Sequence, residues 1–283
     1  MMGRALPDRR GGSRARVAVG LALGVLVARM AYAQDFEPAA PAGVTGSPSV
    51  LIERALPWPA EGARLELLAV RWGGLADFST RGAALDAGWG PARFAAGLSS
   101  SGDAEIGWNA VALAAGLASP LEGVAARVIV RRDRSSPDPA APRAIGIESG
   151  AGFWSALGPR VRVWVSVPGL FGGGESAPLD RGLESGVSIG SGVLAAWLAW
   201  TAPARAADAG ERIAGAGYRT GSLGAWIEAR DRPLRATLGL SVRRAALEVA
   251  AAVSEHPVLG ETARLALIVS RERRSRPDPG ATR

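Results

Sequence analysis

The sequence predicts an all-β protein: an antiparallel transmembrane β-barrel of about 12 strands (roughly 10 to 14) behind a cleaved signal peptide. Three observations support this fold class. Many stretches alternate apolar residues with polar or small ones, which is the period of a β-strand. The second face of these stretches is rich in Gly, Ala and Ser, whereas a water-soluble β-sandwich shows mainly Lys, Glu and Thr to solvent. An export signal comes first in the chain.

The export signal covers residues 1–33. Residues 1–16 are polar and basic, residues 17–28 form an apolar run of twelve, and Ala31-Tyr32-Ala33 is a signal-peptidase site with expected cleavage before Gln34. As a helix the apolar run would rise only about 18 Å, too short to span a bilayer. We therefore expect export by the general secretion route.

Three further segments follow the signal. Residues 34–63 are rich in Pro, Ala and Gly and are interpreted as a linker or a loosely docked N-terminal segment. Residues 64–271 carry the alternating stretches and are assigned to the barrel. Residues 272–283 are rich in Arg, Pro and Asp and are expected to be a disordered basic tail.

The clearest alternation is at residues 160–167, where every second residue is Val, and Arg, Trp or Ser lies between. Residues 235–243 repeat the pattern. About thirteen such runs can be counted, with residues 187–200 taken as one run. The run at residues 64–72 could equally be helical, and removing it leaves the even number that bacterial barrels have. Long loops at residues 168–183 and 201–210 flank residues 187–200, so long and short loops do not alternate strictly.

The chain has nine tryptophans. Four of them lie near predicted strand ends, where a membrane barrel carries an aromatic girdle: Trp72, Trp89, Trp108 and Trp154. The alternative is that tryptophan packs the core. An exported soluble β-protein also remains an alternative to the barrel.

The basic pI of 11.2 suggests a nucleic-acid partner, but the charge is concentrated at the two ends. Residues 34–270 hold 22 Arg and 23 acidic residues, so the body of the chain is close to neutral. A nucleic-acid-binding protein concentrates positive charge on its folded surface. We therefore expect no nucleic-acid partner.

The sequence carries no convincing catalytic or metal motif. The absence of cysteine excludes disulfides and thiolate metal sites. Ser254 and His256 would lie on one strand face, as in barrel phospholipases, but nothing specifies a third group to orient His256. We expect no enzyme activity, no cofactor and no metal.

Six charged residues are candidates for the lumen, because they belong to the polar faces of predicted strands. The four arginines among them would favour anions, or else they would pair with the two glutamates and plug the lumen. These residues are Arg160, Arg162, Arg235, Arg243, Glu228 and Glu248.

The hairpin at residues 255–262 and the strand at residues 263–270 resemble the end of PorV/PorQ-like barrels, which are related to long-chain fatty-acid transporters. This resemblance covers one hairpin and carries over no binding residue. It implies an outer-membrane barrel that takes part in transport or in the assembly of a secretion system.

The leading hypothesis is an outer-membrane barrel, surrounded by lipid, that acts as a narrow pore or carrier for small or apolar solutes. The alternative is a non-conducting barrel with a structural or secretion-assembly role, which would bind a secretion or envelope protein through the long loops at residues 168–183 and 201–210. An exported soluble β-protein or a membrane hydrolase comes third.

Overall fold

The computed structural model describes most of the chain after the N-terminal region. The described residues are 47–59, 62–72, 79–102, 107–133, 145–174, 183–202, 210–232, 234–256 and 260–271. The predicted signal peptide at residues 1–33 and the predicted tail at residues 272–283 lie outside the described residues, so both stay predictions.

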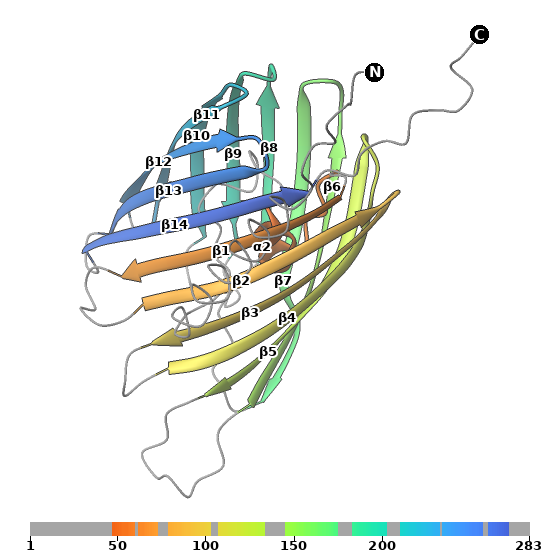
Figure 1. The fold of residues 1–283 in the computed structure, drawn as a ribbon, viewed down its shortest axis with the longest axis vertical. Helices are drawn as coiled ribbons and strands as arrows, with labels where there is room; N and C mark the ends of the chain where they lie inside the picture. The colour runs from red at the N-terminus through yellow and green to blue at the C-terminus, as the bar shows by residue number, and fades with distance from the viewer. Residues whose placement is uncertain are drawn as a thin grey trace, which may run out of the picture.

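Strands in the described residues form one closed antiparallel barrel in which each strand pairs with its neighbours in sequence (Figure 1). β14 pairs with β1 and closes the sheet. The strands are β1 (Gly62–Trp72), β2 (Ser79–Trp89), β3 (Ala92–Gly102), β4 (Gly107–Ala118), β5 (Glu122–Asp133), β6 (Ile145–Ala156), β7 (Val161–Gly174), β8 (Glu184–Gly190), β9 (Leu194–Thr201), β10 (Glu211–Arg219), β11 (Leu223–Asp231), β12 (Leu234–Arg244), β13 (Leu247–His256) and β14 (Gly260–Arg271).

The barrel has 14 strands, two more than the predicted number of about 12 and at the upper bound of the predicted range, for two reasons. The ambiguous run at residues 64–72 is a strand, β1, in which adjacent Leu67 and Leu68 hide the alternation. Residues 187–200 are two strands, β8 and β9, joined by a turn at residues 191–193. Gly192 adopts a φ of 84° in this turn, a left-handed conformation that glycine adopts without strain.

Dividing residues 187–200 also places the two long loops on either side of them, at residues 175–183 and 202–210, at the same end of the barrel. Short turns join the strands at one end of the barrel, at residues 90–91, 119–121, 157–160, 191–193, 220–222 and 245–246. The other end carries the connections longer than four residues, at residues 73–78, 134–144, 175–183 and 202–210, together with shorter ones at residues 103–106, 232–233 and 257–259. In outer-membrane barrels the short turns face the periplasm.

β7 extends further than the sequence suggested. The predicted loop at residues 168–183 begins inside this strand, and Gly172–Gly174 pair with β6 instead of forming a flexible loop. The β6–β7 register shifts between Ser149 and Ala151, opposite the segment that contains Pro168. Proline has no backbone N–H to donate, so a bulge is where a strand tolerates it.

On most strands, side chains alternate between the lumen and the outer face. On β3, Phe94 and Leu98 face outward and are 57% and 62% exposed, whereas Arg93 faces inward and is 1% exposed. The same pattern places exposed Leu, Val and Ile on most strands. Soluble proteins rarely expose so continuous an apolar surface, and hydrocarbon is its natural surrounding.

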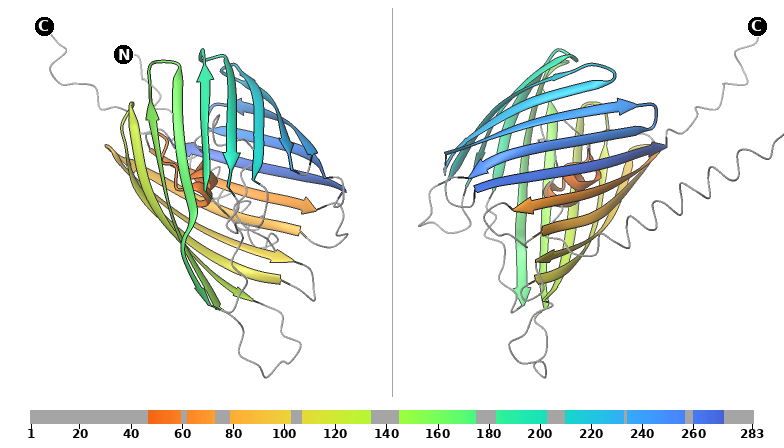
Figure 2. Two further views of the ribbon diagram at one scale, coloured as in Figure 1. Left: turned by 180° about the vertical axis from the view of Figure 1, so that it is seen from behind. Right: turned by 60° about the vertical axis from the view of Figure 1, so that its left-hand side comes forward.

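A short helix, α2 (Pro48–Arg54), lies inside the barrel (Figure 2). Pro48 is its first residue, and its C-cap is Ala55, which has a left-handed φ of 51°. In the described part of the chain, no helix is long and apolar enough to cross a membrane. Because Val50, Ile52 and Leu56 are completely buried, this part of the segment at residues 34–63 is neither a linker nor loosely docked.

Candidate functional site

The interior of the barrel is occupied by residues 47–58, which we call the plug. One face of the plug packs against inward alanines of β2–β5, which we call the alanine wall: Ala84, Ala95, Ala110, Ala112, Ala114 and Ala125. The other face belongs to a buried apolar cluster that includes four tryptophans, which we call the tryptophan wall: Trp154, Trp164, Trp197 and Trp226. The plug therefore separates two different surfaces of one barrel.

A 14-stranded barrel is wide, so its own side chains do not fill the interior without the plug. Barrels of about eight strands can be filled by their own side chains, whereas wider barrels leave a lumen or hold a plug. The alanine wall has short side chains, so the helix can approach the sheet. The tryptophan wall instead fills its part of the interior with the largest side chains available.

The plug is tied to the barrel at both ends. Near its start, the Ser49 N–H donates to Glu66 Oε2 at 2.8 Å. At its end, Ser166 Oγ donates to the Arg54 carbonyl at 2.6 Å, which satisfies a carbonyl that a helix end leaves free. The Trp154 indole N–H donates to the Pro57 carbonyl at 2.9 Å. These bonds hold the plug in one orientation between the walls.

Arg54 adds an ion pair between the plug and the barrel, and a glycine of the barrel makes room for the backbone of the plug at this point. Arg54 Nε lies 3.1 Å from Glu184 Oε2 on β8. Gly152 on β6 lies beneath the same stretch of backbone, and a Cβ at that position would be 2.5 Å from the Ala55 carbonyl oxygen. Any larger residue at Gly152 would push this part of the plug away from the sheet.

Each tryptophan of the tryptophan wall lies across from a glycine on a neighbouring strand. The cross-strand pairs are Trp154 with Gly123, Trp164 with Gly186, Trp197 with Gly215 and Trp226 with Gly239. A Cβ at Gly239 would lie 2.0 Å from the Trp226 ring, and the other three glycines are covered in the same way. The indoles lie flat on the sheet because their partners have no side chain, and they shield the glycine backbone in return.

Arg162 joins the plug to the tryptophan wall. Trp58 of the plug stacks on Trp154, with ring centroids 5.1 Å apart and an interplanar angle of 27°. The Arg162 guanidinium carbon lies 5.3 Å from the Trp58 ring centroid and 5.6 Å from that of Trp154. This is a cation–π contact with both rings.

Two buried carboxylates on the alanine-wall side each bind two arginines. Asp86 binds Arg64 and, at 2.7 Å, Arg93. Glu148 binds Arg127 and, at 2.8 Å, Arg131. None of these residues was singled out from the sequence, because the bonds join strands whose register the sequence does not show. Among the described residues, no group of three or more His, Asp or Glu could hold a metal ion.

Five of the six predicted lumen residues take part in contacts on the tryptophan-wall side. Arg243 pairs with Glu248 at 2.8 Å, and Glu248 also binds Arg219. Arg235 pairs with Glu211 at 2.6 Å. Glu228 pairs with Arg230 at 2.8 Å and accepts a hydrogen bond from the Trp197 indole N–H at 3.3 Å. Arg162 makes the cation–π contact described above.

Arg160 does not share this environment. It lies in the turn between β6 and β7, where strand alternation does not fix the direction of a side chain, and it is exposed. It borders a hollow on the outer face instead of joining the charged groups of the lumen.

The predicted aromatic girdle is only partly present. Trp154 is completely buried in the tryptophan wall, where core packing, the alternative interpretation, applies. Trp89 fits the prediction, since it ends β2 and is 75% exposed. Trp72 ends β1 and donates to Thr80 Oγ1 at 2.9 Å, and Trp108 is half-buried near the start of β4.

Comparison with known proteins supports the fold. No protein-family model matches the chain, and no curated protein matches it. Three solved structures are similar in fold. The Ralstonia pickettii toluene transporter TbuX has a TM-score of 0.53 and 12% identity, and the match covers 81% of this chain and 96% of that chain. The CymD monoaromatic hydrocarbon channel has a TM-score of 0.54 and 12% identity, with 77% of this chain and 90% of that chain covered, and the P. putida toluene transporter TodX has a TM-score of 0.51 and 11% identity, with 81% and 95% covered. At these identities the similarity shows a common outer-membrane-type barrel fold.

Proposed function

We propose that this protein is an outer-membrane barrel through which small apolar solutes pass along the seam between the plug and the tryptophan wall. The observation that carries the proposal is one buried apolar cluster that runs from Val50, Leu56 and Trp58 of the plug across the four tryptophans to alanines of β13 and β14. The seam is therefore apolar on both sides. Export by the predicted signal at residues 1–33 and location in the outer membrane belong to the same proposal.

The chemistry of the interior favours apolar solutes over ions. An ion that leaves water for an apolar seam loses its hydration, and the cation at the seam, Arg162, already lies against the Trp58 and Trp154 rings. The arginines that could attract anions, such as Arg235 and Arg243, bind carboxylates of the barrel. A hydrocarbon loses nothing by the same transfer, and aromatic rings can stack on the indoles.

The similar structures suggest the first solutes to test. Their names describe toluene transporters and a monoaromatic hydrocarbon channel. Because those proteins share the fold at low identity, a monoaromatic hydrocarbon is the first probe for this chain, and its uptake has to be measured.

The test is uptake of labelled toluene by Gram-negative cells that express the full chain, compared with cells that carry an empty vector. The protein must first be recovered from outer membranes with heat-modifiable gel mobility, which shows that the barrel is folded. We expect uptake several-fold above the vector control. Uptake equal to the control, with the barrel folded in the outer membrane, would overturn the proposal.

A second candidate function is a non-conducting barrel that serves as a structural or secretion-assembly partner. The filled lumen favours it, and secretion-system assembly is one of the two roles, beside transport, that a resemblance of the last hairpin to PorV/PorQ-like barrels would imply. The partner would bind at the long-loop end, where residues 175–182 and 203–209 lie outside the described residues. Crosslinking from these two loops to a single envelope protein, together with no toluene uptake, would favour this function.

A further inference from the structure

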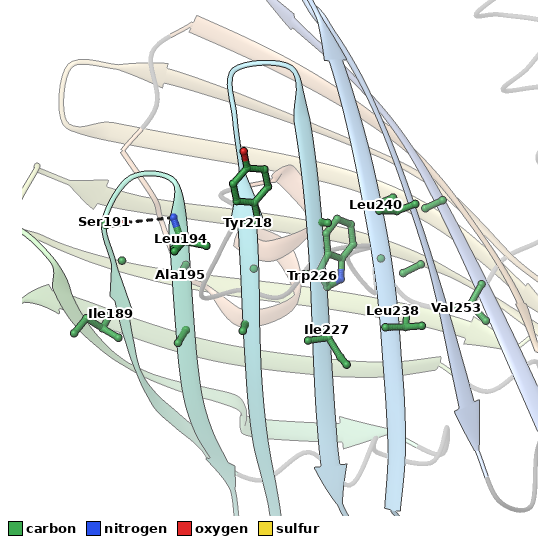
Figure 3. A pocket seen from close by; sticks show the side chains of 18 of the residues that line it. Ile189, Ser191, Leu194, Ala195, Tyr218, Trp226, Ile227, Leu238, Leu240 and Val253 are labelled. Atoms are coloured by element: carbon green, nitrogen blue, oxygen red, sulfur yellow. Dashed lines mark hydrogen bonds between the residues drawn. The ribbon is translucent and has the colours of Figure 1, made fainter.

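The outer face of the barrel contains a hollow of about 1110 Å³ over β8–β13 (Figure 3). Its sides are formed by exposed, mostly apolar side chains: Ile189, Leu194, Tyr218, Ile227, Leu238 and Leu240. The outside of a closed barrel is normally convex, so a depression that extends across six strands needs a cause in the sequence.

The cause is a group of alanines among the outward-facing residues. The strand register arranges these residues in two rows, one of Ile189, Ala196, Ala216, Ile227, Leu238 and Val253, and one of Leu194, Tyr218, Ala225, Leu240 and Ala251. Beneath the rows, the inward positions Gly217 and Gly239 have no side chains. The short residues form a floor and the larger residues around it form the sides.

One end of the hollow has a different chemistry. Arg160 borders it at the short-turn end of the barrel and is exposed, and it forms no ion pair among the described residues. Tyr218, one residue before the end of β10, is 47% exposed and lies on the same side. In a membrane barrel this end lies at headgroup depth, where tyrosine is enriched and where arginine binds phosphate oxygens.

We propose that the hollow binds one glycerophospholipid of the periplasmic leaflet, with an acyl chain over the alanine floor and the phosphate on Arg160. This proposal rests on the membrane location proposed above. An apolar hollow with a cation at its headgroup end matches a lipid that is apolar along its length and anionic at one end. A second copy of the chain fits less well, because in a two-fold contact each copy would offer its own hollow to the other.

The test is native mass spectrometry of the full-length barrel in detergent, with phosphatidylglycerol added stepwise. We expect wild-type barrel to retain one phosphatidylglycerol, and Arg160→Gln to weaken its binding about tenfold by removing a charge-assisted hydrogen bond. Diacylglycerol, which has no phosphate, should bind equally to wild type and Arg160→Gln. Ala216→Leu fills the floor of the hollow and should weaken the binding of both lipids.

Two matched variants serve as controls. Arg244→Gln removes an exposed arginine at the same end of the barrel, and Ala214→Leu enlarges an exposed alanine on the same strand; neither residue borders the hollow. Both should bind phosphatidylglycerol like wild type. Equal binding by all variants, or a dimer mass in place of the lipid-bound monomer, would overturn the proposal. Toluene uptake should be unchanged in Arg160→Gln and Ala216→Leu, so this proposal and the proposed function can fail separately.

Discussion

The alanine wall and the tryptophan wall enclose the same plug by opposite means. On the alanine side, short side chains let the helix approach the sheet, and the remaining space holds carboxylates that each bind two arginines. On the tryptophan side the interior is filled by large rings lying on glycines, and the charged groups lie nearer to solvent. Arg93 is 2% exposed at its side chain, whereas Arg243 is 49% exposed.

The two sides of this wide barrel therefore differ in what fixes them: buried ion pairs lie beside the alanine wall, whereas large apolar rings fill the interior at the tryptophan wall. Buried ion pairs fix geometry, because removing one partner leaves the other without compensation in a region of low dielectric. Of the four indoles of the tryptophan wall, Trp154 donates to the plug, and further polar bonds to the plug on this side come from Ser166 and Glu184. We therefore assign structural rigidity to the alanine side and solute passage to the tryptophan side.

The largest expected effect tests the rigid side. Asp86→Ala should lower the free energy of unfolding by about 3–5 kcal/mol, because Arg93 remains buried after losing its bond to Asp86. The matched change Glu248→Ala, whose partner arginines are 33% and 49% exposed at their side chains, should cost about 1 kcal/mol. Urea unfolding of the barrel in lipid vesicles measures both. Equal losses would remove the distinction between the two sides.

The next effect tests the tryptophan–glycine pairs. Gly239→Val should destabilise the barrel by about 1–3 kcal/mol, because the added side chain overlaps the Trp226 ring. Adding Trp226→Ala to Gly239→Val removes the overlap, so the double variant should lose less than the sum of the single changes.

The control for this cycle is Gly221→Val, at a turn glycine where an added Cβ would meet nothing within 4 Å. It should change the urea midpoint much less than Gly239→Val does. Strict additivity of Trp226→Ala and Gly239→Val would show that the ring and the glycine do not depend on each other.

The smallest effect concerns the contact between the plug and the tryptophan wall. Arg162→Gln removes the cation above Trp58 and Trp154 and should cost about 0.5–2 kcal/mol. The chain has no cysteine, so Ile52→Cys introduces a single thiol within the buried plug. A charged thiol reagent should label it faster in the Arg162→Gln background than in wild type. An unchanged labelling rate would mean that Arg162 does not hold the plug.

The outer surface of this fold could be predicted from the sequence, because lipid contact imposes a period of two on every strand. The alternation at residues 235–243 indicated which side chains face outward, and Leu238, Leu240 and Val242 are exposed as that pattern implies. The strand number was missed only where the pattern failed locally, at Leu67-Leu68 and at the turn that contains Gly192.

The interior could not be predicted in the same way, because its contacts depend on register between strands. Trp226 and Gly239 are adjacent only once the turn between β11 and β12 is known. The plug was missed for a related reason. A seven-residue helix is too short to show a helical period in the sequence, and its polar residues Ser49 and Glu53 are buried instead of marking a solvent-facing side.

The central claim is that the seam between the plug and the tryptophan wall admits apolar solutes and rejects ions. The most direct test is to measure the uptake of toluene and of benzoate, which differs mainly by its negative charge, in the same cells with and without the folded barrel. We expect the barrel to raise toluene uptake several-fold and to leave benzoate uptake at the level of cells without it. Benzoate uptake that rises as much as toluene uptake would contradict the account, because it would show an aqueous lumen.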